Sequence, residues 1–190
     1  TRRSSDLGNE TKNFGSTITG ALNSIESASS SSRYAGIANS IVGVANRTNN
    51  SNGSLVFGAG NEITNSITSI SGAPTSGGDN PNELRNSVKN AVKVAKGGGA
   101  TMAFGGGNKA DYTLRTSMIG INNTVTGADG AESADNLVMG VGNTASNVQH
   151  LTAIGSKNTV SDAKNTVIVG DNRKVTGANN SVIIGSSDAE

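Results

Sequence analysis

The side chains that most often carry out chemistry in proteins are few in this sequence, and they lie apart from one another. His150 is the only histidine, and no serine or cysteine signature of a nucleophilic enzyme accompanies it. Asp129, Glu132 and Asp135 fall in one polar loop, where they do not form the facing pair of carboxylates that general acid–base catalysis needs. The sequence therefore predicts no catalytic residue and no enzymatic activity.

Two glycine strings and one acidic segment resemble ligand-binding motifs only in part. Gly97–Gly99 and Gly105–Gly107 lack the strand, the helix and the Lys-Ser/Thr pair of a phosphate-binding loop. Asp79–Glu83 contains carboxylates and amides, but its proline and short spacing do not fit a calcium loop and fit a helix start better. Since the chain also has no cysteine, we expect no metal site and no cofactor.

One group of cations has a regular spacing. Apolar residues from Leu84 to Ala95 recur at helical intervals before Gly97–Gly99, which predicts an amphipathic helix over about 82–96. A basic stripe follows this helix: Arg85, Lys89, Lys93 and Lys96. The stripe is either the solvated face of a helix that packs on the rest of the protein or an adhesive patch, and the sequence leaves both open.

Most of the remaining chain is a repeat of 15 residues. Four apolar runs end in glycine at positions 140, 155, 170 and 185, and each is followed by a polar turn and a second short strand. A unit this short cannot bury a core alone, so successive units must stack. The aromatic content of 3% fits a stack of thin coils better than an ordinary globular core.

Three expansions interrupt the repeat. The largest lies between Gly58 and Gly105, which are 47 residues apart, 32 more than the period. Shorter expansions are a Ser-rich loop at 27–33 and a loop at 128–133. We expect a lead-in or degraded coil over 1–16, coils over 17–63 and 101–190, and an insertion over 64–100 that carries the helix.

Two consecutive positions before the glycine are apolar in nearly every repeat. Neighbouring residues of a strand point to opposite faces, so one column fills the interior and the other points outward. An outward apolar column requires partner chains, and a closed ring of identical chains would cover it. The sequence leaves open which column is core and which is interface. The structural positions considered for these roles are Ile41, Val56, Met118, Val138, Ile168 and Ile183.

Asparagine occupies the third position after the glycine in seven repeats. Asparagine tolerates left-handed turns, and stacked copies can form an amide ladder, so we interpret this column as structural. The fifth position is a second apolar column, with Thr48 as its exception. We therefore expect two strands in each coil. The asparagines are Asn23, Asn46, Asn61, Asn108, Asn123, Asn143 and Asn158.

The repeat resembles a known family. Ser181-Val-Ile-Ile-Gly185 and Leu151-Thr-Ala-Ile-Gly155 resemble the Ser-Val-Ala-Ile-Gly repeat of YadA-like heads in trimeric autotransporter adhesins, and the resemblance covers residues 17–188 apart from the insertion. It implies an all-β, left-handed parallel β-roll in a homotrimer. The family's period is close to 14, whereas the period here is 15, and its simplest heads lack the insertion.

The resemblance also implies a location and a role. Such heads stand on a coiled-coil stalk at the cell surface of Gram-negative bacteria, anchored in the outer membrane, and they bind host cells, extracellular-matrix proteins or other bacteria. We expect the chain to be a fragment of such a protein, since it shows no signal peptide and stops within a coil. We expect no nucleic-acid partner. Contact with a membrane is expected only through an anchor outside this fragment, because no run approaches the roughly 20 apolar residues of a membrane helix.

Two other functions remain open at this point. The chain can be a structural spacer in the adhesin fibre, without a ligand of its own. More remotely, Thr124-Val-Thr126 and Thr144-Ala-Ser146 approach the threonine ladders of ice-binding solenoids, although later copies contain serine and lysine.

Overall fold

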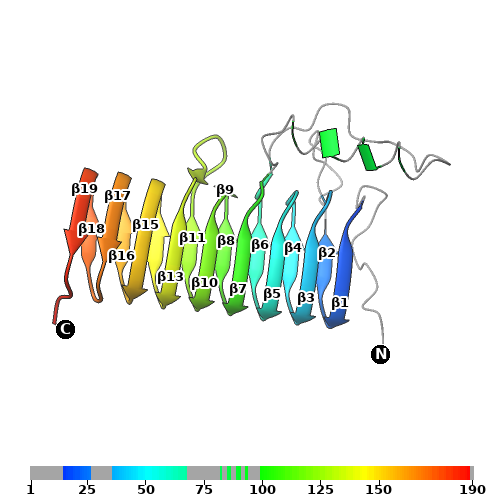
Figure 1. Ribbon diagram of the computed structural model, residues 1–190, viewed down its shortest axis with the longest axis horizontal. Coiled ribbons are helices and arrows are strands. Elements are labelled where there is room, and N and C mark those ends of the chain that lie inside the picture. Colours follow the sequence, from blue (N-terminus) through cyan, green and yellow to red (C-terminus); the bar gives the residue numbers. More distant parts are fainter. Residues whose placement is uncertain are drawn as a thin grey trace.

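The computed structural model shows an all-β parallel roll built from stacked coils (Figure 1). It describes residues 15–26, 36–67, 82, 85–86, 89–90, 93 and 99–188. Each coil contributes one long and one short strand, except the last described coil, which has only the long strand β19 (Asn179–Ile184). The long strands are β1 (Thr17–Ala21), β3 (Ser40–Val44), β5 (Leu55–Ala59), β7 (Met102–Gly106), β10 (Ser117–Ile121), β13 (Leu137–Val141), β15 (Gln149–Ser156), β17 (Lys164–Val169) and β19 (Asn179–Ile184). The short strands are β2 (Ser24–Glu26), β4 (Arg47–Asn49), β6 (Glu62–Thr64), β8 (Lys109–Asp111), β11 (Thr124–Thr126), β14 (Thr144–Ser146), β16 (Thr159–Ser161) and β18 (Lys174–Thr176).

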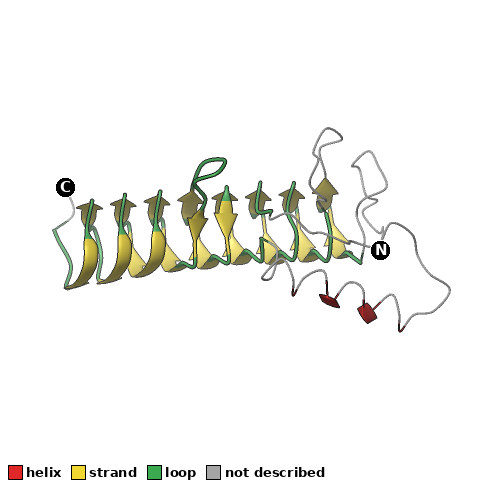
Figure 2. Ribbon diagram, turned by 90° about the horizontal axis from the view of Figure 1, so that it is seen from above, coloured by secondary structure: helices red, strands yellow, loops and turns green. Residues whose placement is uncertain are grey.

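The two kinds of strand form two parallel sheets that face each other across the coil (Figure 2). Each long strand pairs with the long strand of the next coil, and each short strand with the next short strand. The repeat glycine sets the register of the long-strand sheet. Gly43 pairs with Gly58, and Gly120 with Gly140, even though the loop between the latter two coils is longer. The loops and the insertion therefore leave the stack of coils undisturbed.

Some coils also have a third strand that pairs with its neighbours. The expectation of two strands in each coil did not include it. Two short strands, β9 (Thr113–Leu114) and β12 (Ser133–Ala134), lie between the short-strand and long-strand sides. Ala134 continues this ladder to Gln149 in β15, and Gln149 pairs with Lys164 in β17. In β9 and β12 the inward residues, Thr113 and Ser133, are small and polar, so these two strands lack the apolar alternation by which a strand is recognised in sequence.

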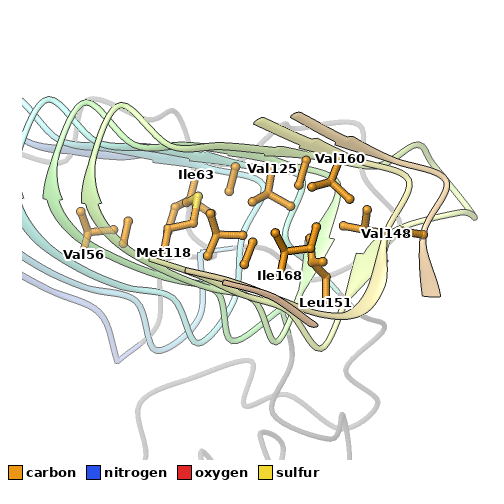
Figure 3. Close-up of a cluster of buried hydrophobic side chains, with 14 of the residues drawn as sticks. Val56, Ile63, Met118, Val125, Val148, Leu151, Val160 and Ile168 are labelled. Carbon is orange, nitrogen blue, oxygen red and sulfur yellow. The ribbon is translucent and has the colours of Figure 1, made fainter. Parts of the chain in front are cut away.

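The apolar core lies between the two sheets (Figure 3). The column two residues before the glycine comes from the long strands and meets the fifth position after the glycine, which comes from the short strands. Val56, Met118 and Ile168 of the first column are fully buried, as are Ile63 and Val125 of the second. Ile41 and Val138 are also fully buried, and Ile183, in the last coil, packs against the core and is partly buried. The residue two before the glycine is therefore the core column.

The glycine column allows successive coils to approach closely. Gly140 has a φ of 129°, and a Cβ placed on it would lie 1.8 Å from the carbonyl oxygen of Gly155. The same contact recurs from Gly20 to Gly170 with distances of 1.8 to 2.2 Å. No side chain fits there, because real Cβ atoms do not approach backbone oxygen that closely. The glycine is thus required in every coil of this stack.

The buried asparagines form a continuous ladder along the roll. The Nδ2 of Asn123 donates to Asn108 Oδ1 at 3.0 Å and to the carbonyl oxygen of Gly140 at 2.9 Å. Its Oδ1 accepts from the backbone N and the Nδ2 of Asn143 at 3.2 and 2.9 Å. Each interior rung therefore links its own coil to both neighbours.

Three buried hydroxyls of one coil have no hydrogen-bond partner: Thr48 Oγ1, Ser51 Oγ and Ser54 Oγ. Thr48 lies in the core column of the short strands, in register with Ile25 and Ile63 on either side. A hydroxyl loses its hydrogen bonds to water on burial, and without a partner in the protein this loss is not offset. Thr48 is thus a polar group at a position that favours a branched apolar residue.

We expect Thr48→Val to stabilise the roll by about 1 kcal/mol, because the substitution keeps the shape and removes the unpaired hydroxyl. The matched control is Thr166→Val, since Thr166 is also buried but its Oγ1 donates to the carbonyl oxygen of Ala178 at 2.9 Å. The control should lose about 1 kcal/mol. Urea unfolding at a fixed protein concentration measures both, and a destabilised Thr48→Val would contradict the assignment.

Candidate binding surfaces

The outward face of the long-strand sheet is apolar along the roll. The residue before the glycine points outward on this sheet, and so do its neighbours two positions away on either side. Large apolar residues exposed on this face include Phe57 at 53%, Ile121 at 52% and Ile184 at 74% of the residue's surface. Phe57 stacks on Phe104 of the next coil with ring centroids 6.1 Å apart. The other large apolar residues exposed on this face are Val44, Ile119, Val141, Val167, Val169 and Val182.

The outward face of the short-strand sheet is polar. Its positions hold charged residues, hydroxyls and amides, among them Glu26, Glu62, Lys109 and Thr124. None of the large apolar residues exposed in the described part of the chain lies on a short strand. The repeat therefore presents two outward faces of opposite character. The short-strand face is polar, whereas the long-strand face is apolar, and its exposure to water is unfavourable.

Ion pairs connect neighbouring coils on the polar face. The guanidinium of Arg47 lies between two carboxylates, at 2.7 Å from Glu26 Oε2 and 2.7 Å from Glu62 Oε1. The hydrogen bond from Arg47 lowers the pKa of Glu26 below its usual value, and the same bond raises the pKa of Arg47. Because these side chains are about a third exposed, solvent screening keeps their contribution to stability small.

The residues examined for catalysis are dispersed. His150 is an exposed residue near the start of β15, with a left-handed backbone φ of 52°. Asp135 accepts two hydrogen bonds from Arg115, at 2.6 and 2.8 Å, and this pairing, with a smaller contribution from His150, lowers the pKa of Asp135. Asp129 and Glu132 lie in the loop closed by the Ala128–Ala131 bridge. Within the described ranges, no three acidic, histidine or cysteine side chains gather as metal ligands.

The basic stripe is described at three of its four residues. Arg85, Lys89 and Lys93 are helical and exposed, in keeping with the four-residue spacing that places them on one face. Lys96 lies outside the described residues, as do Asp79 and Glu83 of the acidic segment considered above. Asn86 and Asn90, on the same helix, are also exposed. The stripe is thus available to solvent at its described positions.

The insertion leaves and re-enters the roll at one place, later than the expected boundary at residue 64. Thr64 ends β6, and both Ser66 and Ile67 are buried in the roll. Ser66 Oγ donates to Thr101 Oγ1 at 2.7 Å, and β5 pairs directly with β7. The ends of the insertion are therefore already adjacent, and the coils before and after it stack on one another.

Open hollows occur along the edges of the roll. One of about 220 Å³ is lined by Asn147, Gln149, Asp162, Ala163 and Lys164. Another, of about 330 Å³, lies beside the 127–132 loop. A third, of about 350 Å³, lies near the last coil and is lined by Lys157, Thr159, Asn172, Arg173, Lys174, Ser187 and Asp188. The cations of this last hollow, Lys157, Arg173 and Lys174, form a cluster that the sequence did not reveal, because they come from two different coils.

Comparison with protein-family models, with curated proteins and with solved structures finds no significant match to this chain. Among the described residues, no helix has both the length and the apolar character needed to cross a membrane. The proposals below therefore rest on the residues, on the geometry of the roll and on the resemblance of its repeat.

We expect deletion of residues 68–99 to leave the roll folded. The deletion joins Ile67 to Ala100 and brings Gly58 and Gly105 back to the 15-residue spacing of the neighbouring coils. Circular dichroism and the thermal unfolding midpoint of the shortened chain test this. Deletion of residues 64–100 is the control, because it also removes Ser66 and Ile67 from the coil and should destabilise it. A deletion of 68–99 that unfolds the protein would overturn the assigned boundaries.

Proposed function

We propose that this chain is the head of a bacterial cell-surface adhesin, assembled from three copies and attaching the cell to host cells, extracellular matrix or other bacteria. The observation that carries the proposal is the apolar outward face of the long-strand sheet, together with the glycine-closed repeat. The resemblance of that repeat to YadA-like heads supplies the number of chains, the left-handed winding and the location at the surface of a Gram-negative bacterium.

The apolar face supports association because it is extensive and uncovered. It runs from Val44 in β3 to Ile184 in β19, with an exposed large apolar residue on most of the long strands between them. Apolar surface of this extent favours burial against a partner. Other copies of the same chain are the occupant we propose, because each copy presents the same apolar columns at the same coil spacing. A closed ring buries them without leaving an open surface that would form filaments.

Adhesion by surface contact agrees with the remaining features. The polar face stays exposed when the apolar face is covered. The basic stripe of Arg85, Lys89 and Lys93 would occur three times on a trimer, and repeated weak contacts gain affinity when they bind simultaneously. The alternative function is a spacer without its own ligand. A spacer would have the same roll and the same trimer but would not bind cells, matrix or other bacteria.

The ice-binding alternative is disfavoured by the polar face itself. Hydroxyl residues such as Thr124 and Thr126 share the face with Arg47, Glu62 and Lys109, so charged side chains interrupt any regular array of threonines. The absence of thermal hysteresis would remove this alternative.

Light scattering over a dilution series should give a molar mass of roughly 57 kDa, three times the 19.0 kDa of the chain. Ile121→Lys, on the apolar face, should shift the mass to that of one chain, because it buries a charge in the interface. Thr124→Lys in the same coil is the control and should remain assembled, since it lies on the polar face. If the wild-type chain stays monomeric even when fused to a trimeric coiled coil, the assembly and the adhesin head proposed on it are both wrong.

Adhesion is tested separately, with fluorescent beads coated with the assembled head and exposed to host cells, matrix proteins and bacteria. The triple variant Arg85→Gln, Lys89→Gln, Lys93→Gln should lower bead binding by several-fold, because it removes three cations from each copy. The variant Lys109→Gln, Lys164→Gln removes two cations of the roll that lie outside the stripe and should retain most of the binding. Equal losses in both variants would reject the stripe as the adhesive patch. No binding by the wild-type head would favour the spacer.

A further inference from the structure

The hollow of about 350 Å³ near the last coil gathers side chains from three successive turns. Lys157 and Thr159 come from the first turn, and Asn172, Arg173 and Lys174 from the second. Ser187 and Asp188 come from the third. The hollow lies at the corner between the long and the short strands, where the register of β16 and β18 places Thr159 beside Lys174. Among the described residues, it holds three cationic side chains against one carboxylate.

These cations differ from the arginines of the earlier coils. Arg47 and Arg115 are each paired with carboxylates in adjacent coils. In the described part of the chain, no ion pair involves Lys157, Arg173 or Lys174. Two lysines and an arginine that share one hollow without such pairing create a positive potential that attracts an anion.

Arg173 holds an unusual position in the fold. It replaces the asparagine of the amide ladder, and its backbone N donates to Asn158 Oδ1 at 2.9 Å, as an asparagine rung does. Its Nε donates to the carbonyl oxygen of Gly185, the bond that Asn158 Nδ2 makes to Gly170. The backbone thus orients the guanidinium through Nε. Its Nη groups make no hydrogen bond to the described residues and stay available for a ligand.

We propose that this hollow binds the anionic group of an acidic saccharide, either a sulfate ester or a sugar carboxylate. The guanidinium and the two ammonium groups would pair with the anion through charge-assisted hydrogen bonds. Thr159, Asn172 and Ser187 carry hydroxyl and amide groups that match sugar hydroxyls.

The lining argues against two other polyanionic partners. None of its seven residues is aromatic, so it lacks the stacking platform by which proteins hold single-stranded nucleic acid. None is a large apolar residue, so it lacks the anchor pocket that is usual in protein interfaces. Because the hollow is formed by one chain, the proposal holds whether or not the chains assemble, and its failure would leave the proposed adhesin head standing.

The test is calorimetric titration of the intact 190-residue chain with three probes at low and physiological salt. The probes are a sulfated uronate oligosaccharide, the same oligosaccharide without sulfate, and inorganic sulfate. Binding of the sulfated probe alone identifies a sulfate ester as the ligand group, and equal binding of both oligosaccharides identifies the carboxylate. An oligonucleotide of similar charge should bind at least tenfold more weakly.

The decisive variant is Arg173→Asn, which removes the guanidinium and extends the ladder by its own residue type, so the roll should remain folded. It should weaken saccharide binding by about tenfold or more, as loss of a charged hydrogen-bonding group does. Asp188→Asn should strengthen binding, because it removes the carboxylate found among the described lining residues.

Lys174→Gln and Lys109→Gln form a matched pair. The two lysines occupy the same position after the repeat glycine, but Lys109 pairs in register with Glu62 and does not line the hollow. Lys174→Gln should weaken binding several-fold, and Lys109→Gln should change it less than twofold. Equal losses in the two variants, unchanged binding in Arg173→Asn, absence of saccharide binding, or equal binding of the oligonucleotide would each overturn the proposal.

Discussion

Each asparagine of the ladder has a side-chain amide buried away from water, so its donors and acceptor need hydrogen-bond partners within the protein. The stacking of the coils provides these partners. The Nδ2 of one rung donates to the preceding rung and to the glycine carbonyl of the next coil, while its Oδ1 accepts from the following rung. Removing one rung leaves polar groups unpaired on both neighbouring coils, at a cost of about 1–3 kcal/mol for each group. The ladder therefore binds the coils to a common register rather than merely filling a turn.

The glycine column and the ladder constrain each other. The carbonyl that accepts from the asparagine belongs to the glycine whose missing Cβ allows the coils to approach, as at Gly140 and Gly155. With this contact fixed, the residue two before the glycine faces the interior and the residue directly before it faces outward. The same local contact that holds neighbouring coils together thus also determines which apolar column remains on the surface.

The repeat, its glycines and the apolar columns could be predicted from the sequence because each leaves a periodic mark. Three features could not. Alternation is symmetrical, so the pattern alone does not say whether Ile119 or Met118 faces inward. The third side of the coil buries hydroxyls such as Thr113 and Ser133, which look like loop residues. The cluster of Lys157, Arg173 and Lys174 depends on the spacing of coils in space, since two of its members are neighbours and the third lies a full repeat away.

The two outward faces are under different constraints, and this difference explains where variation can enter the roll. Positions on the polar face hold arginine, glutamate, lysine or threonine in successive coils, because the backbone ladders and the buried columns fix the fold without them. The apolar face has no such freedom if it is to remain continuous. Even a rung of the amide ladder can change when the replacement preserves its bonds, as Arg173 does through its backbone N and Nε. A charged group is thereby held rigidly at the corner of the roll, at a position where the fold itself requires only a hydrogen-bond donor.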